Sequence, residues 1–114
     1  MKKFHISDIL CVISGKMVSI RNMEGLYDIL NYMTDDNLHM HQLPRVMDEC
    51  RPYLVERFPQ LESIDVSGAN DSNLLTIIER IEAEHGSYFE VNRIPEEAHK
   101  KINPIAEMFL MNKN

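Results

Sequence analysis

A block of 23 residues near the N-terminus constrains the fold more than any other part of the chain. Residues 23–45 read MEGLYDILNYMTDDNLHMHQLPR. The polar run 34–37 is typical of a turn, and Pro44 suits the first turn of a following helix. Apolar side chains recur before the turn at helical spacing, which predicts one buried helix face made of Leu26, Ile29, Leu30 and Met33. The block therefore predicts two helices joined by an acidic turn.

The sequence before and after this block predicts further short elements. Ser7 can cap a first helix, and Gly15 can end it in the left-handed conformation. Residues 88–94 (YFEVNRI) form the best strand pattern, and residues 16–20 and 3–6 are its two candidate partners. Because an isolated strand leaves its backbone groups unpaired, we expect at least one of these partners to pair with it.

The third and last helices carry proline signals of different kinds. Pro52 falls inside the third helical pattern, so we expect a kink there or two short helices. The pair Asn103-Pro104 is a strong start signal for a last helix, with an inward stripe predicted at Ile105, Met108 and Phe109. The expected fold is a single α+β domain over residues 1–114, with four to five short helices packed on a small two- to three-stranded sheet.

Charge is distributed unevenly along the chain, whose net charge is −6. Residues 1–22 carry Lys2, Lys3, Lys16 and Arg21 against one acidic residue, whereas residues 23–114 carry 8 basic and 17 acidic residues. Binding to a phosphate backbone needs clustered lysine and arginine, which only the short N-terminal arm offers. An acidic surface favours a basic protein partner, although it also serves solubility alone.

Metal and nucleophile chemistry have few candidates in this sequence. His39 and His41 could reach one metal from an extended segment, but no spaced set of further ligands accompanies them. Cys11 lies in an apolar run and is expected to be buried, while Cys50 has no surrounding protease signature. We therefore expect no metal, no cofactor and no catalytic residue, and the chain is predicted not to be an enzyme.

Localisation follows from the absence of long apolar runs in the sequence. A membrane span needs about 20 apolar residues, and the longest runs here are only a few residues long. Lys2 and Lys3 are followed by polar residues rather than by the apolar core of a secretory signal. We expect a cytoplasmic protein that does not associate with membranes.

Several segments of the N-terminal half form a pattern over about the first 45 residues: 4–10 (FHISDIL), 23–34 (MEGLYDILNYMT), 36–38 (DNL) and 41–45 (HQLPR), together with Gly15. In this pattern the chain resembles a family of small uncharacterised proteins encoded by bacteriophages and prophages. The resemblance implies a bacterial host cell during infection, but it assigns no catalytic residue. It raises the expectation of a small protein that binds and modulates host factors, including defence systems.

The leading functional hypothesis is a phage-type accessory protein that binds and inhibits a host protein, in the manner of an anti-CRISPR. Its acidic side chains would meet a basic, nucleic-acid-binding partner, and exposed methionine and leucine would add apolar contact. The predicted partner-binding residues are Glu24, Asp28, Asp35, Asp36, Met40, Glu79, Glu82, Glu84, Leu110 and Met111. Two alternatives stay open: a nucleic-acid-binding regulator that uses the N-terminal basic residues, and a metal-dependent enzyme around His39 and His41.

Overall fold

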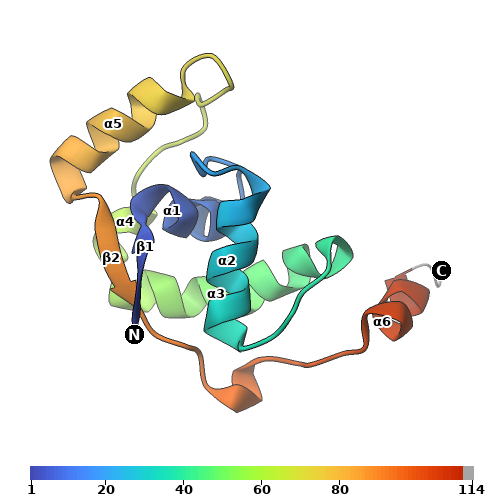
Figure 1. Cartoon of the computed structure of the whole chain (residues 1–114). Coiled ribbons are helices and arrows are strands. Elements are labelled where there is room, and N and C mark those ends of the chain that lie inside the picture. Colours follow the sequence, from blue (N-terminus) through green and yellow to red (C-terminus); the bar gives the residue numbers. More distant parts are fainter. Residues whose placement is uncertain (112–114) are drawn as a thin grey trace.

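The computed structural model describes residues 1–111 and contains helices and strands in one α+β arrangement (Figure 1). In the described residues the elements are β1 (Lys2–His5), α1 (Ile6–Ser14), α2 (Met23–Thr34), the 3-10 turn η1 (Met40–Gln42), α3 (Leu43–Arg57), α4 (Pro59–Glu62), α5 (Leu74–His85), β2 (Tyr88–Val91), the 3-10 turn η2 (Glu96–Ala98) and α6 (Pro104–Met111). The α+β class is thus confirmed, with one α-helix more than the predicted upper number because the single turn α4 follows α3.

The sheet joins the N-terminus to the segment that follows α5. Strands β1 and β2 are antiparallel, with Lys2 opposite Val91 and His5 opposite Tyr88. The predicted strand at residues 16–20 is wrong, because that segment is a loop. Its backbone amides are bound by side chains instead of a neighbouring strand: Val18 N donates to Cys11 Sγ (3.3 Å), Ile20 N to Ser7 Oγ (3.3 Å) and Arg21 N to Ser19 Oγ (3.0 Å).

Helices α1, α2 and α3 enclose the core. The predicted inward face of α2 is confirmed, since Ile29 and Leu30 are fully buried and Leu26 and Met33 are nearly so. Three helices that cross at close range can exclude water from large aliphatic side chains, and this burial is the main stabilising contribution. Helix α3 continues through Pro52 as one helix of 15 residues, so the expected division there did not occur.

The end of β1 passes directly into α1. His5, not Ser7, caps this helix: the Ser7 amide donates to His5 Nδ1 at 3.1 Å. Gly15 ends α1 with φ 73°, as predicted, in a conformation that glycine adopts without steric cost. The histidine can take the capping position because its ring nitrogen is a hydrogen-bond acceptor.

Helices α5 and α6 lie at opposite ends of the molecule (Figure 1). On α5, Ile78 and Ile81 are buried, but Leu75 is 64% exposed. After β2 the chain runs in an extended path beneath α2 and α3 before it forms α6. Among residues 1–111 we find no helix that has both the length and the apolar character needed to cross a membrane.

Candidate functional site

The predicted acidic contacts on α2 lie in different environments. Glu24 is exposed. Asp28 accepts a hydrogen bond from Arg21 Nη1 at 3.1 Å and lies 3.6 Å from Lys2 Nζ. Asp35 ends the helix in the left-handed conformation, and its carboxylate is 3.6 Å from Arg93. Glu24 and Asp35 are therefore the more accessible carboxylates of this group.

The acidic residues of α5 divide in a similar way. Glu79 and Glu84 are exposed. Glu82 instead accepts a hydrogen bond from the Ser87 hydroxyl at 2.6 Å and lies 3.3 Å from His5 Nε2. The Ser87 contact, followed by His5, lowers the pKa of Glu82. Glu82 thus fixes the turn before β2, while Glu79 and Glu84 remain exposed, the latter 3.8 Å from His85 Nε2.

Asp36 belongs to a second internal contact, which centres on the buried ring of His99. His99 Nε2 lies 2.7 Å from Asp36 Oδ2, and Nδ1 lies 2.5 Å from Glu49 Oε1. Each ring nitrogen of His99 therefore faces a carboxylate oxygen, and the ring links the acidic turn after α2 to α3. Burial raises the pKa of Asp36, but hydrogen bonds from His99 and the Asn37 amide outweigh it and hold that pKa below its usual value.

Arg45 extends this contact to the last helix. Its Nε and Nη2 atoms donate to the two carboxylate oxygens of Glu107, each at 2.8 Å, and Nη1 donates to Glu49 at 2.7 Å. Gln42 Nε2 adds a hydrogen bond to Glu107 at 3.0 Å. The result is one polar network that ties α6 and the segment before it to α3. We call the six residues of this network the C-terminal clamp: Asp36, Gln42, Arg45, Glu49, His99 and Glu107.

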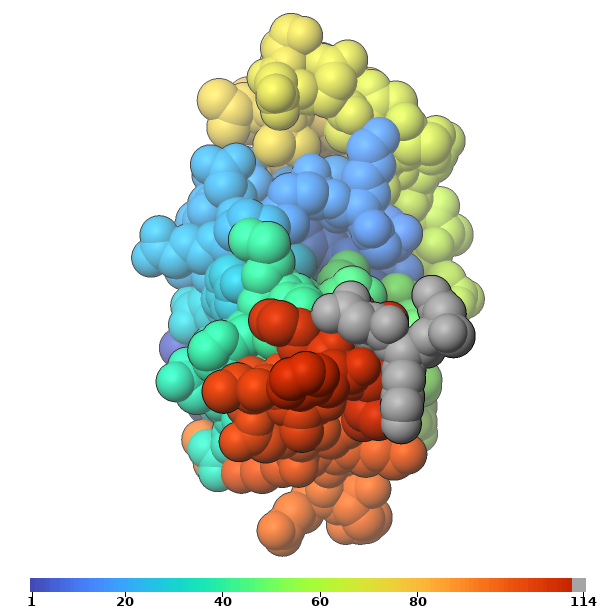
Figure 2. Space-filling view, turned by 90° about the vertical axis from the view of Figure 1, so that its right-hand side faces the viewer, coloured from blue at the N-terminus to red at the C-terminus, as the bar shows by residue number. Residues whose placement is uncertain are grey.

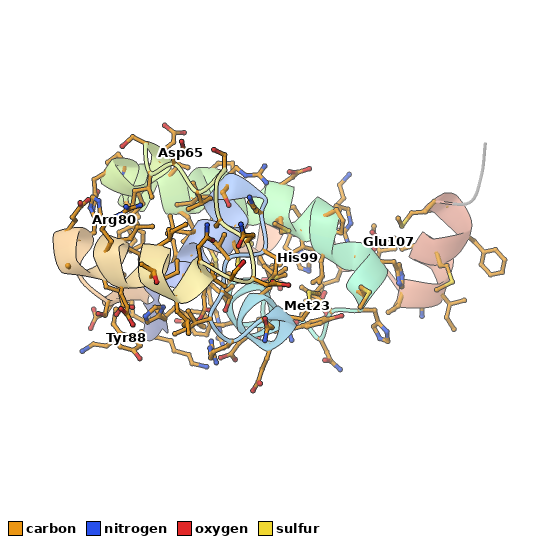
Figure 3. All side chains as sticks on the ribbon, turned by 90° about the horizontal axis from the view of Figure 1, so that it is seen from above. Met23, Asp65, Arg80, Tyr88, His99 and Glu107 are labelled. Atoms are coloured by element: carbon orange, nitrogen blue, oxygen red, sulfur yellow. The ribbon has the colours of Figure 1, made fainter. Side chains whose placement is uncertain are left out.

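The clamp controls the ionisation of Glu107, which lies between α6 and α3 (Figure 3). The hydrogen bonds from Arg45 lower the pKa of Glu107 from 4.5 to about 2, against an opposing effect of burial. A two-pronged arginine–carboxylate contact of this kind is both strong and directional. Sequence reasoning missed it because Arg45 and Glu107 are 62 positions apart and neither stands in a local motif.

The pKa of Glu107 predicts an acid-sensitive attachment of α6. A carboxylate whose pKa is depressed on folding contributes stability above its unfolded pKa and loses it as the pH falls through the folded pKa. Hydrogen exchange of the α6 amides should therefore be slower in the wild type than in Glu107→Gln at neutral pH. This difference should shrink as the pH falls from about 4.5 to about 2. A difference that is constant across that range would contradict the role given to Glu107.

The two histidines of the candidate metal pair lie before the third helix, and one of them contacts the last helix. His41 Nε2 lies 2.8 Å from the Pro104 carbonyl oxygen, at the start of α6. The rings of His39 and His41 are 6.2 Å apart. No cluster of three or more histidine, cysteine, aspartate or glutamate side chains suited to a metal occurs within residues 1–111. His41 is therefore best described as a contact that positions the last helix.

A serine, a histidine and a glutamate form a linear arrangement near the sheet. The Ser7 hydroxyl lies 2.8 Å from His5 Nδ1, and His5 Nε2 faces Glu82. The order matches that of a nucleophile, a base and an orienting acid. However, Ser7 is completely buried, and His5 Nδ1 already accepts the Ser7 amide as a helix cap. This arrangement fixes the junction of β1, α1 and α5, and its hydroxyl is out of reach of a substrate.

The two thiols are equally inaccessible. Cys11 and Cys50 are free and buried. Burial raises the pKa of Cys11 to about 11 and that of Cys50 to about 12. A nucleophilic cysteine needs the opposite, a depressed pKa and partial exposure.

A pocket of about 450 Å³ lies beside His99, with Met33 and Ile94 on its apolar side and Arg93 and Lys101 among its charged residues. Every buried side-chain nitrogen and oxygen in the described part of the chain has a hydrogen-bond partner. The pocket therefore receives no orphaned polar group that would mark a ligand.

The basic N-terminal residues do not form a free cationic surface. Arg21 Nη2 donates to the fully buried Asp8 at 2.6 Å, and its other nitrogen contacts Asp28. Lys2 also lies close to Asp28, and Lys16 Nζ donates to the Ser67 carbonyl oxygen at 2.8 Å. Lys3 is exposed. This arrangement weakens the nucleic-acid-binding alternative, since phosphate contacts require available cations.

Helix α6 has the opposite orientation from that predicted. Glu107 is its buried residue, whereas the stripe expected to face inward is exposed: Ile105 by 67%, Met108 by 49% and Phe109 by 73%. Apolar periodicity identifies one face of a helix but not whether that face is buried. The predicted stripe is therefore present, but it faces solvent instead of the core. Leu110 and Met111, and Met40 in the neighbouring η1, are exposed as the hypothesis required. The exposed apolar surface comprises Met40, Ile105, Met108, Phe109, Leu110 and Met111, and we call it the α6 surface.

Comparison with known families gives one result. A family model described as "Domain of unknown function (DUF7736)" matches residues 4–64, which is more than half of the 114 residues. The chain belongs to the DUF7736 family. No curated protein and no solved structure matches it.

The DUF7736 match covers the helices that enclose the core. Residues 4–64 include α1, α2, α3 and the ion pair between the buried Asp8 and Arg21. Helices α5 and α6 lie beyond it, as do His99 and Glu107, which complete the C-terminal clamp. The DUF7736 core thus supplies Arg45 and Glu49, to which the following part of this chain is attached.

Proposed function

We propose that this protein is a phage-type accessory protein without enzymatic activity, which binds a host protein and inhibits it as an anti-CRISPR-like, anti-defence factor in the bacterial cytoplasm. The observation that carries the proposal is the orientation of α6. Helix α6 buries its only charged residue and exposes its apolar stripe, as a helix does where it forms a protein-binding surface.

The exposed carboxylates support a basic partner. Glu24, Asp35, Glu79 and Glu84 remain accessible on α2 and α5. Together with the net charge of −6, they would steer the chain toward a positively charged surface, such as one that binds nucleic acid. Leu110 and Met111 would then supply apolar contact, which contributes more to affinity than exposed charge does.

The experiment starts with affinity capture from bacterial lysate, followed by affinity measurement with the purified host protein. Leu110→Ser should weaken binding about tenfold or more, which corresponds to about 1.4 kcal/mol. Leu75→Ser is the matched control because Leu75 is 64% exposed and Leu110 is 61% exposed. Equal affinities for the wild type and Leu110→Ser would count against α6 as the contact.

The acidic contact is tested separately through the salt dependence of the same affinity. Glu79→Gln combined with Glu84→Gln should slow association at low salt and flatten its dependence on ionic strength. Glu56→Gln combined with Glu62→Gln removes the same charge from other exposed positions and serves as the control. Asp36 is left unchanged, because its contact with His99 would mix folding with binding. An unaltered association rate in the first variant would remove α5 from the interface.

A further inference from the structure

The exposed side chains of the α6 surface are all apolar. Figure 2 shows α6 on the outer face of the molecule, next to the segment that contains η1. Ile105, Met108 and Phe109 follow the i, i+3, i+4 spacing of a helix-packing seam. Such a seam normally packs against another helix, and here its side chains are between 49% and 73% exposed.

This exposure is built into the fold, because the helix is held from its other side. Asn103 Oδ1 accepts hydrogen bonds from the Ile105 and Ala106 amides, at 2.9 and 3.2 Å, and thereby caps the helix. His41 contacts the Pro104 carbonyl oxygen, and Arg45 binds Glu107 through two hydrogen bonds. These polar contacts fix α6 while its apolar stripe stays turned toward solvent.

The area of the α6 surface matches the requirement of a small dimer. If a large apolar side chain has an accessible area of roughly 200 Å², the exposed fractions of Ile105, Met108 and Phe109, which share one helix face, give roughly 400 Å². Met40 adds roughly 100 Å² on the same scale. Two such surfaces would bury about 1,000 Å² in total, the lower limit for a specific interface. An apolar patch of about 500 Å² lies at the upper end of what monomers expose, and patches of that size often mark interaction sites.

The charges at the α6 surface do not prevent a second copy of the chain from packing there. The six side chains of the α6 surface are uncharged, and Glu107 is turned inward and neutralised by Arg45. A self-complementary apolar seam suits a two-fold axis, the commonest symmetry of soluble oligomers. The net charge of −6 on each chain opposes approach at long range only, where salt screens it.

We infer that a second copy of this chain covers the α6 surface in the free protein, with two α6 helices packed about a two-fold axis. Interfaces at the lower limit of the specific range are typical of transient complexes, so we expect the dimer to form at micromolar concentrations. A host protein that uses the same helix competes with the second copy, a consequence that rests on the proposed function. Dimerisation then keeps the apolar surface covered until the partner is present.

Sedimentation velocity over a range of micromolar concentrations tests the dimer directly. The wild type should move from monomer to dimer as its concentration rises, and Phe109→Asp should remain monomeric. Leu75→Asp adds the same charge at a similarly exposed apolar position on α5 and should still dimerise. Added salt should strengthen the wild-type dimer, because it screens the repulsion between two acidic chains without weakening an apolar seam.

A cross-linking measurement does not depend on the behaviour of Phe109→Asp. Ala106 and Ala83 are both exposed helical positions, on α6 and α5 respectively. Under mild oxidation Ala106→Cys should form a covalent dimer at least tenfold faster than Ala83→Cys. A wild type that stays monomeric would overturn the inference, as would a dimer that survives Phe109→Asp. The inference would also fail if only lipid vesicles or a host protein covered the α6 surface. The dimer can form without any host partner, and a monomeric protein can still bind one. Each of the two proposals can therefore be wrong while the other stands.

Discussion

Leu30→Ala should lower the free energy of unfolding by about 2–5 kcal/mol, the range measured for large-to-small changes in close-packed cores. Leu30 is fully buried on α2, where it belongs to the core that also contains α1 and α3. The substitution removes apolar contact and leaves a cavity that rigid helices fill only in part. Chemical denaturation monitored by circular dichroism measures the change.

Leu75→Ala is the control for this prediction. It removes the same atoms from a side chain that is 64% exposed, so its cost should stay within about 0.5 kcal/mol. If both variants unfolded at the same denaturant concentration, Leu30 would not lie in the core. Because a domain of this size has a total stability of about 5–15 kcal/mol, the loss in Leu30→Ala would be a large share of it.

The parts of the fold that follow from local patterns were predictable. The stripe on α2, the stop at Gly15 and the start of α6 at Asn103-Pro104 each depend on residues within a few positions of one another. Their signals come from side-chain periodicity and backbone capping, which act over a single turn of helix. These elements could therefore be predicted from local sequence alone, without any tertiary contact.

Long-range polar contacts were not predictable in the same way. The Arg45–Glu107 contact and the placement of His99 between Asp36 and Glu49 join residues that are 50 to 63 positions apart. A single sequence gives no measure of which distant carboxylate meets which cation. For this reason Asp36 was predicted to be a partner contact, while the structure uses it to hold the C-terminal segment.

The candidate site shows the same division. Met40, Leu110 and Met111 were predicted to be exposed apolar contacts, and they are exposed. Ile105 and Phe109 belong to a regular stripe, and a regular stripe predicts burial. That they face solvent instead identifies α6 as the helix whose sequence and environment disagree, and such disagreements are expected at functional surfaces.

Arg21→Met should lower the free energy of unfolding by about 3 kcal/mol, because it leaves a buried carboxylate without its cation. Asp8 is fully buried and accepts hydrogen bonds from Arg21 Nη2 and from the Ser19 hydroxyl, both at 2.6 Å. The packing on the Oδ1 side is close: a Cβ atom on Gly25 would lie 2.3 Å from Asp8 Oδ1. The Ser19 contact remains, which places the cost at the low end of that for an unpaired buried charge.

A double-mutant cycle separates this electrostatic cause from a simple loss of packing. If the cost arises from the stranded charge, Arg21→Met should cost less than about 1 kcal/mol in an Asp8→Asn background, where no charge is left unpaired. Lys2→Met is the control, since Lys2 and Asp28 form an exposed pair whose loss should cost at most about 1 kcal/mol. An Arg21→Met cost that is the same in both backgrounds would mean that the arginine stabilises the domain through its aliphatic stem and not through Asp8. The loop over residues 16–22 would then depend on apolar contact alone, although its amides are bound by the side chains of α1 and Ser19.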